Sequence, residues 1–341
     1  MKLAHDLKVA SVDSQGTDAV LLSFALSADQ EAPFGFVPGQ YLTIAAGPAG
    51  NEQWRCYSLT SDPQDRARIS VLVRRVRDGL VSNWLCDHAR AGQELQVLPP
   101  AGRFTLRQPG QPALLFAGGS GIAPIFSLAR QALLDGAPRV GLFYANRDRA
   151  TAMLMDELEQ LKALYADRLD LRCWYDVEQG LPTAPAIAAC AAHTAAPDAY
   201  LCGPEPFMHS VQGVLSAAGL EAGHILCEEF ATDPVAQTAS AAGEESDRAE
   251  DCAVLSVRLK GQLHQLPAQK KDTLLNAMIK AGLPVPHACK VGECASCMCR
   301  LVSGDIERLS SSVLDDDDVE AGWLVACRTR AVGAEVSIKF A

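Results

Sequence analysis

Short runs of alternating apolar and polar residues dominate the first third of the chain. Examples are "YLTIAAG" (41–47), "ISVLVRRV" (69–76) and "ELQVLPP" (94–100), and residues such as Gly and Pro separate these runs. A period of two places the apolar side chains on one face of an extended strand, while Gly and Pro mark the turns. Residues 1–108 are therefore predicted to form an antiparallel β-barrel.

The pattern changes after residue 108, where continuous apolar runs are followed by stretches with helical periodicity. Three such pairs occur: 113–121 with 122–136, 140–147 with 153–168, and 199–204 with 205–219. Apolar strands that alternate with helices are typical of a parallel sheet covered on both faces. Residues 109–230 are therefore predicted to form a doubly wound α/β domain.

The region after residue 230 begins with a segment that has little means of forming a core. Residues 231–252 contain six acidic residues, one basic residue and no aromatic residue. Burial of so little apolar surface cannot offset the entropy of ordering, so we expect a flexible linker, with an exposed acidic loop as the alternative. Residues 253–341 are predicted to form a small mixed α+β domain with one clear helix, which Asp272 would cap at its start and Gly282 would end.

Composition narrows the classes of protein that fit this pattern. The chain has 341 residues, 48% of them apolar and 21% charged, as is typical of globular domains. It lacks an uninterrupted apolar run of 18 residues and a basic start followed by an apolar run, so we expect a cytoplasmic protein without a membrane partner. The net charge of −11 comes without a basic stripe, which argues against nucleic acid as a partner.

Twelve cysteines in a cytoplasmic chain indicate metal binding, because the cytosol keeps thiols reduced. In "HACKVGECASCMC" (287–299), three of them have the spacing C-x4-C-x2-C, and a fourth ligand candidate follows after 29 intervening residues. This is the spacing of a plant-type 2Fe–2S cluster. Zinc is the alternative, but structural zinc sites usually pair C-x2-C knuckles, and only one is present. The predicted ligands are Cys289, Cys294, Cys297 and Cys327, whereas Cys299 is expected to pack inward.

Two features of the barrel region are suited to a flavin. "WRCYSLTS" (54–61) offers a cation, an aromatic ring and a hydroxyl in Arg55, Tyr57 and Ser58, which can bind a phosphate and stack on a flat heterocycle. "DGLVSNWLCDHARAG" (78–92) has Gly79 and then Ser82 as the expected N-cap of a short helix that ends near Gly92. A helix start opened by small residues is an anion site suited to a flavin pyrophosphate. FAD is therefore expected, with FMN as the alternative.

A glycine-rich turn opens the α/β domain at its first junction of strand and helix. "AGGSGIAPI" (117–125) has glycines at 118, 119 and 121, which permit a tight turn near a pyrophosphate, and Pro124 suits a first helical turn. This turn predicts a nicotinamide dinucleotide site. Arg147 and Arg149 follow the second strand, where they would bind a 2′-phosphate or form surface ion pairs. We expect NADH as the donor, and NADPH stays the alternative.

The order of "RCYS", "GGSGIAP", "CGPEPFM" and the cysteine loop resembles the ferredoxin–NADP reductase superfamily fused to a C-terminal plant-type ferredoxin of β-grasp fold. The resemblance covers essentially the whole chain. Within it, "RCYSLTSDP", "SNWLCDHARAG", "FYANRD" and "LDDDDVEAGWLVAC" are most similar to reductase components of 3-ketosteroid 9α-hydroxylases, which are Rieske oxygenases. Reductases of phenylacetyl-CoA epoxidases follow closely.

The resemblance implies roles for individual residues of the flavin domain. Tyr57 would contact the isoalloxazine ring, with Arg55 and Ser58 toward the phosphate side. The ribityl chain and phosphate would be lined by Leu72, Val73 and Arg74. The pyrophosphate of FAD would be bound by Gly79 and Ser82.

Further roles are implied for the nucleotide and ferredoxin domains. The nicotinamide nucleotide would be bound by Gly119, Ser120, Gly121 and Pro124. Cys202 would lie near the nicotinamide ring, while Phe230 would cover the flavin beside Glu228 or Glu229. Glu293 departs from the small residue of many ferredoxins, so the potential of the cluster cannot be carried over.

The implied activity is electron transfer from NADH through FAD and the cluster to a separate oxygenase, because only a flavin accepts a hydride and releases its electrons singly. The sequence has neither a Rieske C-x-H pair nor a facial triad of its own. Alternatives are a reductase for an epoxidase-like or other multicomponent monooxygenase, a reductase for a non-oxygenase acceptor such as a hybrid-cluster protein, and a redox-sensing regulator. The acidic run 314–323 is either a docking patch or a solvated helix start, and we favour the latter.

Overall fold

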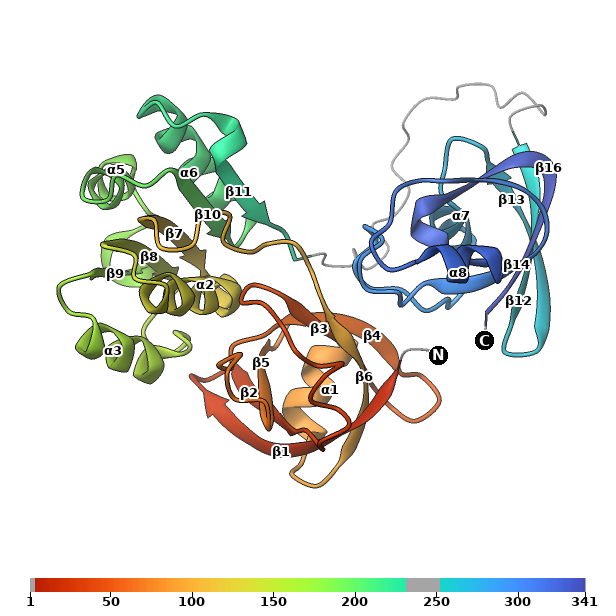
Figure 1. Cartoon of the computed structure of the whole chain (residues 1–341), viewed down its shortest axis with the longest axis horizontal. Coiled ribbons are helices and arrows are strands. Elements are labelled where there is room, and N and C mark those ends of the chain that lie inside the picture. The colour runs from red at the N-terminus through yellow and green to blue at the C-terminus, as the bar shows by residue number, and fades with distance from the viewer. Residues whose placement is uncertain (1–3, 231–251, 341) are drawn as a thin grey trace. The chain divides into compact units, whose positions relative to one another are not determined.

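Three β-sheets organise the protein. The computed structural model describes residues 4–230 and 252–340, and Figure 1 labels their helices and strands. Contacts divide the chain into two compact units, of which the larger contains residues 6–52 and 57–230 and the other contains the C-terminal sheet. The predicted linker lies outside the described residues except for Cys252, which begins a strand. The three predicted fold classes are confirmed.

The first sheet has six strands in the order β4-β3-β6-β1-β2-β5. Its strands are β1 (His5–Gln15), β2 (Ala19–Ala25), β3 (Tyr41–Ala46), β4 (Gln53–Ser58), β5 (Arg68–Arg74) and β6 (Glu94–Ala101). Neighbours pair antiparallel where β1 meets β2, β2 meets β5 and β3 meets β6. An antiparallel bridge between Leu59, directly after β4, and Val71 of β5 joins the two ends of this order. The strands therefore close into a barrel.

Helix α1 (Leu80–His88) packs against this barrel and contributes Val81 and Leu85 to its core. Two details of the predicted helix were wrong, because it starts after Gly79 and ends at His88 rather than near Gly92. Ser82 is not the N-cap, since it lies within the first turn. Its Oγ instead accepts a hydrogen bond from the backbone N–H of Val76 at 3.2 Å and fixes the preceding turn.

The second sheet is parallel, with the order β11-β10-β7-β8-β9. Its strands are β7 (Ala113–Gly118), β8 (Val140–Asn146), β9 (Leu169–Tyr175), β10 (Asp198–Cys202) and β11 (Ile225–Glu228). Its helices are α2 (Ile122–Leu134), α3 (Met155–Leu164), α4 (Asp176–Gln179), α5 (Ala184–Ala192) and α6 (Glu205–Ala217). Of these, β9, β11, α4 and α5 were not among the segments predicted from the sequence.

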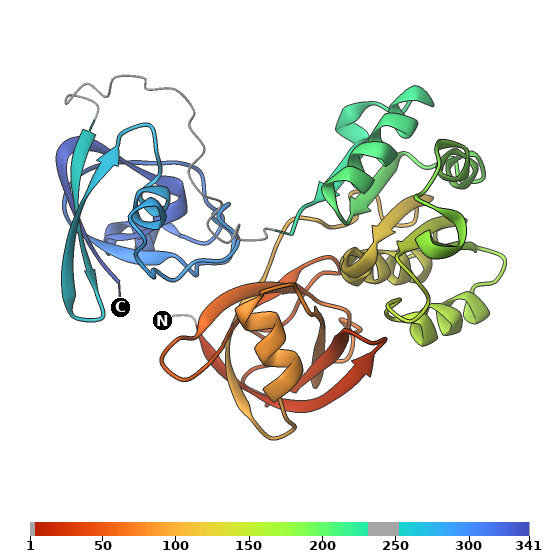
Figure 2. The same ribbon diagram turned by 180° about the vertical axis from the view of Figure 1, so that it is seen from behind.

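Residues of β7 face two hydrophobic cores in alternation. Leu115 and Ala117 pack in one core with residues of α2 and α3, while Leu114 and Phe116 pack in another with residues of α5 and α6. Figures 1 and 2 show α2 and α3 on one face of the sheet and α5 and α6 on the other. This double burial explains why β7 reads as a continuous apolar run.

The third sheet has the order β13-β12-β16-β14-β15 and is mixed, because β12 and β16 pair parallel. Its strands are β12 (Cys252–Leu259), β13 (Gln262–Gln269), β14 (Met298–Arg308), β15 (Trp323–Val325) and β16 (Thr329–Lys339). Helix α7 (Leu274–Lys280) packs on it through Leu274, Leu275 and Met278. A helix packed on a mixed sheet of this kind is the predicted β-grasp arrangement.

The predicted cap of α7 was wrong by one residue. Thr273 is the N-cap and its Oγ1 accepts a hydrogen bond from Asn276 N at 3.3 Å, whereas Asp272 accepts one from Lys280 Nζ at 2.6 Å. Gly282 follows the helix with a φ of +73°, as expected for its end. The acidic run forms α8 (Asp316–Glu320), and Asp315 accepts a hydrogen bond from Asp318 N at 2.7 Å. This run therefore caps a helix, as favoured from the sequence.

Candidate cofactor and electron-transfer sites

The parallel sheet has a topological switch point between β7 and β10. The chain runs from β7 to β8 and β9 on one side and then crosses to β10 on the other side of β7. Ligands of open α/β sheets bind outside the carboxyl ends of the strands at such a point. One turn of 3₁₀ helix, η1 (Gly119–Gly121), follows β7 here and leads into α2, while Gly203 follows β10.

The segments after β7 and β10 touch through their backbones. A methyl group on Gly121 would lie 2.1 Å from the carbonyl oxygen of Cys202, and one on Gly203 would lie 2.9 Å from the Cα of Gly118. Only glycine fits at such distances. The structure thus brings the predicted nucleotide residues together, and these are Gly119, Ser120, Gly121, Pro124 and Cys202.

Cys202 is fully buried at the end of β10. Its burial, and then the charge of Glu228, raise the pKa of its thiol well above the ordinary value. The thiol therefore stays protonated at neutral pH and cannot serve as a nucleophile. Glu228 is its partner in the parallel register of β10 and β11, and Phe230, two residues beyond, is 43% exposed. The two predicted flavin-side residues thus lie at the same edge of the sheet.

Arg74 lies at the nucleotide turn. It ends β5, and a methyl group on Gly119 would come within 2.7 Å of its Nη1. The sequence placed Leu72, Val73 and Arg74 along a flavin. Leu72 packs in the core shared with the nucleotide domain and Val73 in the barrel core, so their backbones alone are left to line a ligand.

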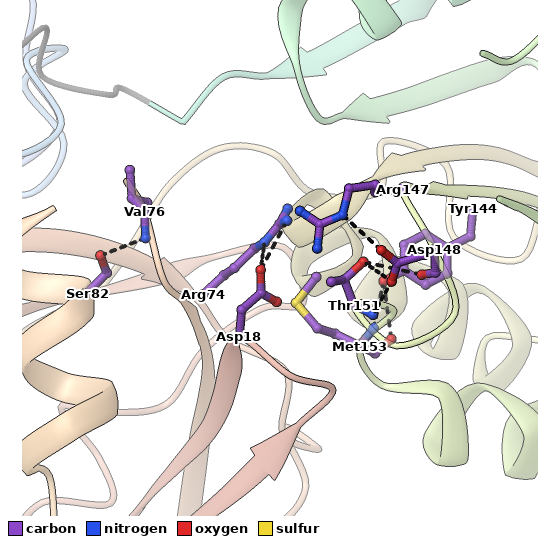
Figure 3. Close-up of polar contacts among 9 residues, drawn as sticks. All are labelled: Asp18, Arg74, Val76, Ser82, Tyr144, Arg147, Asp148, Thr151 and Met153. Carbon is purple, nitrogen blue, oxygen red and sulfur yellow. Dashed lines mark hydrogen bonds and ion pairs between the residues drawn. The ribbon is translucent and has the colours of Figure 1, made fainter. Parts of the chain in front are cut away.

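Arg147 and Arg149, which follow β8, both form ion pairs. Figure 3 shows Arg74 and Arg147 pointing toward one another. Arg147 donates from Nε to Asp148 Oδ2 at 2.9 Å, and Arg149 donates two hydrogen bonds to Glu178 at 2.7 and 3.1 Å. Hydrogen bonds from Arg147 and then Thr151 lower the pKa of Asp148 to about 2. Asp148 is consequently ionised throughout the physiological range.

The flavin candidates lie at the barrel. Tyr57 packs against the barrel core and is half-buried, while Ser58 is buried. Arg55 donates from its guanidinium to Trp54 O at 2.8 Å and to Gln53 Oε1 at 3.0 Å. These contacts orient the guanidinium of Arg55 on β4, the strand that also carries Tyr57 and Ser58.

The start of α1 fits a pyrophosphate. A methyl group on Gly79 would lie 2.7 Å from Ser82 Oγ, so a side chain at this position would clash with the Ser82 hydroxyl. The Ser82 hydroxyl accepts from Val76 N and keeps its own hydrogen to donate. Together with the N–H groups of the first turn of α1, that hydrogen can bind an anion.

The four predicted ligand thiols form two pairs. Cys289 contacts Cys294, and Cys297 contacts Cys327. Backbone N–H groups also point at sulfur, from Cys289 to Cys294 Sγ at 3.4 Å and from Cys327 to Cys297 Sγ at 3.5 Å. Such donors stabilise thiolates and cluster sulfur.

The donor set fits a binuclear cluster better than a single ion. In a 2Fe–2S cluster each iron takes two thiolates, whereas structural zinc takes four ligands at one point. Within residues 4–230 and 252–340, no group of three or more His, Cys, Asp or Glu side chains gathers around one position. All twelve cysteines lie in these ranges, and none of them forms a disulfide there.

The cluster loop turns sharply between α7 and β14. Lys290, Gly292 and Ala295 have φ values of +59°, +84° and +56°, and a methyl group on Gly292 would lie 2.5 Å from Arg328 Cγ. These turns direct successive N–H groups inward. Cys299 is fully buried on β14, and burial raises the pKa of its thiol, so the prediction that it packs inward is confirmed.

Domain families match each of the three folds. Residues 6–106 match the oxidoreductase FAD-binding domain, 115–213 the oxidoreductase NAD-binding domain and 257–332 the 2Fe-2S iron-sulfur cluster binding domain. The ferredoxin reductase component of 3-ketosteroid-9-alpha-monooxygenase from Rhodococcus rhodochrous is 39% identical over 339 residues, covering 98% of this chain and 96% of that protein. This chain belongs to the family of oxygenase reductase components.

Two further relatives resemble this reductase over nearly its whole length. One component of the 1,2-phenylacetyl-CoA epoxidase from Escherichia coli K12 is 29% identical, covering 100% of the reductase and 98% of that protein. The solved structure of phthalate dioxygenase reductase, described as modular for electron transfer from pyridine nucleotides to 2Fe–2S, superposes with a TM-score of 0.61 at 26% identity, covering 99% and 98% of the two chains. The resemblance, the reductase function and the three cofactor classes predicted from the sequence are confirmed.

Some features of the reductase escaped the sequence prediction. The contact of Arg74 with the nucleotide turn was missed because the two positions are 45 residues apart in different domains, and no local pattern connects them. Asp18, which binds Arg74, lies in an ordinary hairpin turn. Among the described residues, no helix of the reductase is long and apolar enough to cross a membrane.

Proposed function

We propose that this reductase transfers electrons from NADH, through FAD and a 2Fe–2S cluster, to a separate Rieske-type oxygenase of a 3-ketosteroid 9α-hydroxylase-like system. The supporting observation is the 39% identity to such a reductase component across all three domains. The flavin would supply the exchange of one hydride for two single electrons. The docking partner is the oxygenase, and we place the protein in the cytoplasm.

The proposed roles of the residues follow their positions. Tyr57 would stack on the flavin ring, with Arg55 and Ser58 toward its phosphate side and Gly79 and Ser82 at the pyrophosphate. The nucleotide would lie at η1 and the start of α2, beside the protonated thiol of Cys202. Iron would be held by Cys289, Cys294, Cys297 and Cys327.

The nucleotide is proposed to be NADH because the arginines that follow β8 already form ion pairs with carboxylates. Arg147 pairs with Asp148 at 2.9 Å and Arg149 with Glu178 at 2.7 Å. A 2′-phosphate would have to displace these carboxylates before it gained a guanidinium. We expect kcat/KM for NADH to exceed that for NADPH.

An anaerobic titration of the purified protein with NADH tests the electron path. Visible spectroscopy, EPR and chromatography of the released flavin would follow the titration. Flavin bleaching followed by a rhombic 2Fe–2S signal is expected, with FAD as the released flavin. Bleaching without a cluster signal would refute the four-cysteine assignment, and a released FMN would refute the cofactor.

Reconstitution tests the acceptor. The purified oxygenase component of the R. rhodochrous 3-ketosteroid-9-alpha-monooxygenase is the probe, with ferricyanide as the reference acceptor. NADH-dependent substrate hydroxylation supports the proposal. Fast ferricyanide reduction without hydroxylation would leave the reductase intact but refute this partner.

A second candidate acceptor is an epoxidase. The similarity to the E. coli 1,2-phenylacetyl-CoA epoxidase component spans 100% of the chain and favours this candidate after the first. The remaining components of that epoxidase, assayed with phenylacetyl-CoA, would separate the two. Slow turnover with every acceptor, ferricyanide included, would instead support a redox-sensing regulator.

A further inference from the structure

We propose that Asp18, a residue of the flavin domain, selects NADH over NADPH by disfavouring the 2′-phosphate. This inference rests on the proposed function. The acid lies in the hairpin turn between β1 and β2, far in sequence from the residues that bind the nucleotide. Figure 3 shows it between the barrel and the segment after β8.

The backbone fixes this hairpin against the nucleotide domain. Thr17 N donates to Ala150 O at 2.9 Å, and Arg75 N donates to Asp18 O at 2.8 Å. Gly16 has a φ of +56°, and a methyl group there would lie 2.7 Å from Ala150 O. The position of the Asp18 side chain is therefore set by two strands and the loop after β8.

The carboxylate is only partly neutralised by its partner. Arg74 approaches Asp18 Oδ2 with both Nε and Nη2, each at 3.4 Å, which is a weak hydrogen-bond distance. Oδ1 is shielded from solvent and has no hydrogen-bond partner among the described residues. The side chains of Asp18 and Arg74 are 26% and 29% exposed, so solvent screens their charges less than those of a fully exposed pair.

The field of Asp18 reaches the position where a 2′-phosphate would be bound. Arg147 follows β8 and points toward Arg74, the partner of Asp18 (Figure 3). In agreement with this geometry, the pKa of Arg147 is raised by its hydrogen bond to Asp148, then by the charge of Asp148, and in smaller measure by Asp18. A dianionic phosphate that drew on Arg147 would stand in the same negative field. NADH lacks that phosphate and does not meet the repulsion.

Asp148 is a poorer candidate for this selection. Its Oδ1 accepts from Thr151 N at 2.8 Å and from Thr151 Oγ1 at 2.9 Å, while its Oδ2 accepts from Arg147. Both oxygens are thus used in closing the loop. In many dinucleotide domains the selecting acid follows the second strand. Here the second strand, β8, ends at Asn146 and Arg147 follows it, so the acid of the neighbouring domain would supply the charge.

The test compares the two nucleotides in Asp18→Asn, a substitution that a turn tolerates well. The readouts are kcat/KM for NADH and NADPH, and calorimetric Kd values for ADP-ribose and 2′-phospho-ADP-ribose on the oxidised holoenzyme. Effects on the shared pyrophosphate cancel in each ratio. We expect both ratios to shift toward the phosphorylated ligand by about threefold to tenfold.

The matched control is Asp170→Asn. Asp170 pairs with Arg172 at 3.0 Å, and its side chain is 20% exposed while that of Arg172 is 29% exposed, close to the values of the Asp18–Arg74 pair. Its ratios should equal those of the unchanged protein. A similar shift in this control would overturn the assignment, because any lost carboxylate would then act alike.

Further arms separate the remaining outcomes. Asp18→Ser should repeat the shift at full flavin content, and Asp18→Asn in an Arg147→Gln background should give a smaller one. Unchanged ratios in both Asp18 variants would overturn the inference while the preference for NADH stands. Failure of either nucleotide to reduce the unchanged holoenzyme would instead overturn the proposed function.

Discussion

Single residues separate the cluster ligands from the other cysteines. Four thiols meet in two pairs, and Cys294 and Cys297 accept backbone N–H groups, whereas Cys299 is fully buried on β14. The spacing in the sequence was enough to find these four, because a plant-type cluster takes its ligands from one short loop and one remote position.

We therefore expect Cys297→Ser to abolish the 2Fe–2S EPR signal while NADH still bleaches the flavin. Cys299→Ala is the control. It should retain the cluster and lower the free energy of unfolding by about 1 kcal/mol through the small cavity it leaves. Loss of the signal in Cys299→Ala would make that residue a ligand candidate instead.

The position of Arg74 favours a role at the nucleotide turn over the role at the flavin that the sequence suggested. Its Nη1 points at Gly119 of the nucleotide turn. Arg74→Gln should raise KM for NADH about tenfold, with kcat and flavin content little changed, because the phosphate of a nucleotide bound at η1 would lose a charge-assisted contact with this guanidinium. Loss of flavin from the purified variant would return Arg74 to the flavin site.

At the scale of elements, the sequence predicted which segments form strands or helices better than it predicted the residues at which they begin and end. The alternation of apolar and polar residues with a period of two, together with the continuous apolar runs, identified β3, β5, β6, β7, β8 and β10. The caps failed for a physical reason: Asp272 and Thr273 are adjacent and both can cap a helix, so the phase of α7 on its core decides between them. Strand β9 was missed because its polar Asp170 and Arg172 break the apolar run.

The cap of α7 can be tested directly. Thr273→Ala should lower the free energy of unfolding of the ferredoxin domain by about 1 kcal/mol. Asp272→Ala removes a pair whose Lys280 side chain is 66% exposed, so its effect should be smaller. Thermal unfolding followed by cluster absorbance would measure both, and the opposite ranking would contradict the observed cap.

The junction of η1 with β10 predicts a sharper effect. Gly121→Ala places a methyl group against Cys202 O, so the turn must shift. We expect NADH-dependent flavin reduction to fall on the order of a hundredfold, with flavin still bound. Gly213→Ala in α6 is the control, because its methyl group would meet no atom of the described residues within 4 Å outside the backbone of that helix. It should stabilise the protein by about 0.5–1 kcal/mol.

At the scale of the whole molecule, the division into two units predicts separable activities. The nucleotide domain and most of the barrel belong to one unit, and the cysteine loop belongs to the other. A protein shortened to residues 1–230 should bind FAD and reduce ferricyanide with NADH, yet fail to reduce cytochrome c. Rapid cytochrome c reduction by this fragment would show that the cluster is not needed for electron transfer to cytochrome c.

Strand β7 is buried along its full length, from Ala113 to Gly118, and lies at the centre of its sheet between β10 and β8. Its amide protons should therefore exchange with deuterium among the slowest in the chain, opening only with global unfolding of the unit. The turn that follows this strand is consequently attached to a backbone segment that we expect to be among the most stable against local unfolding. Nucleotide binding should leave the exchange of β7 unchanged and slow that of Gly119 to Gly121.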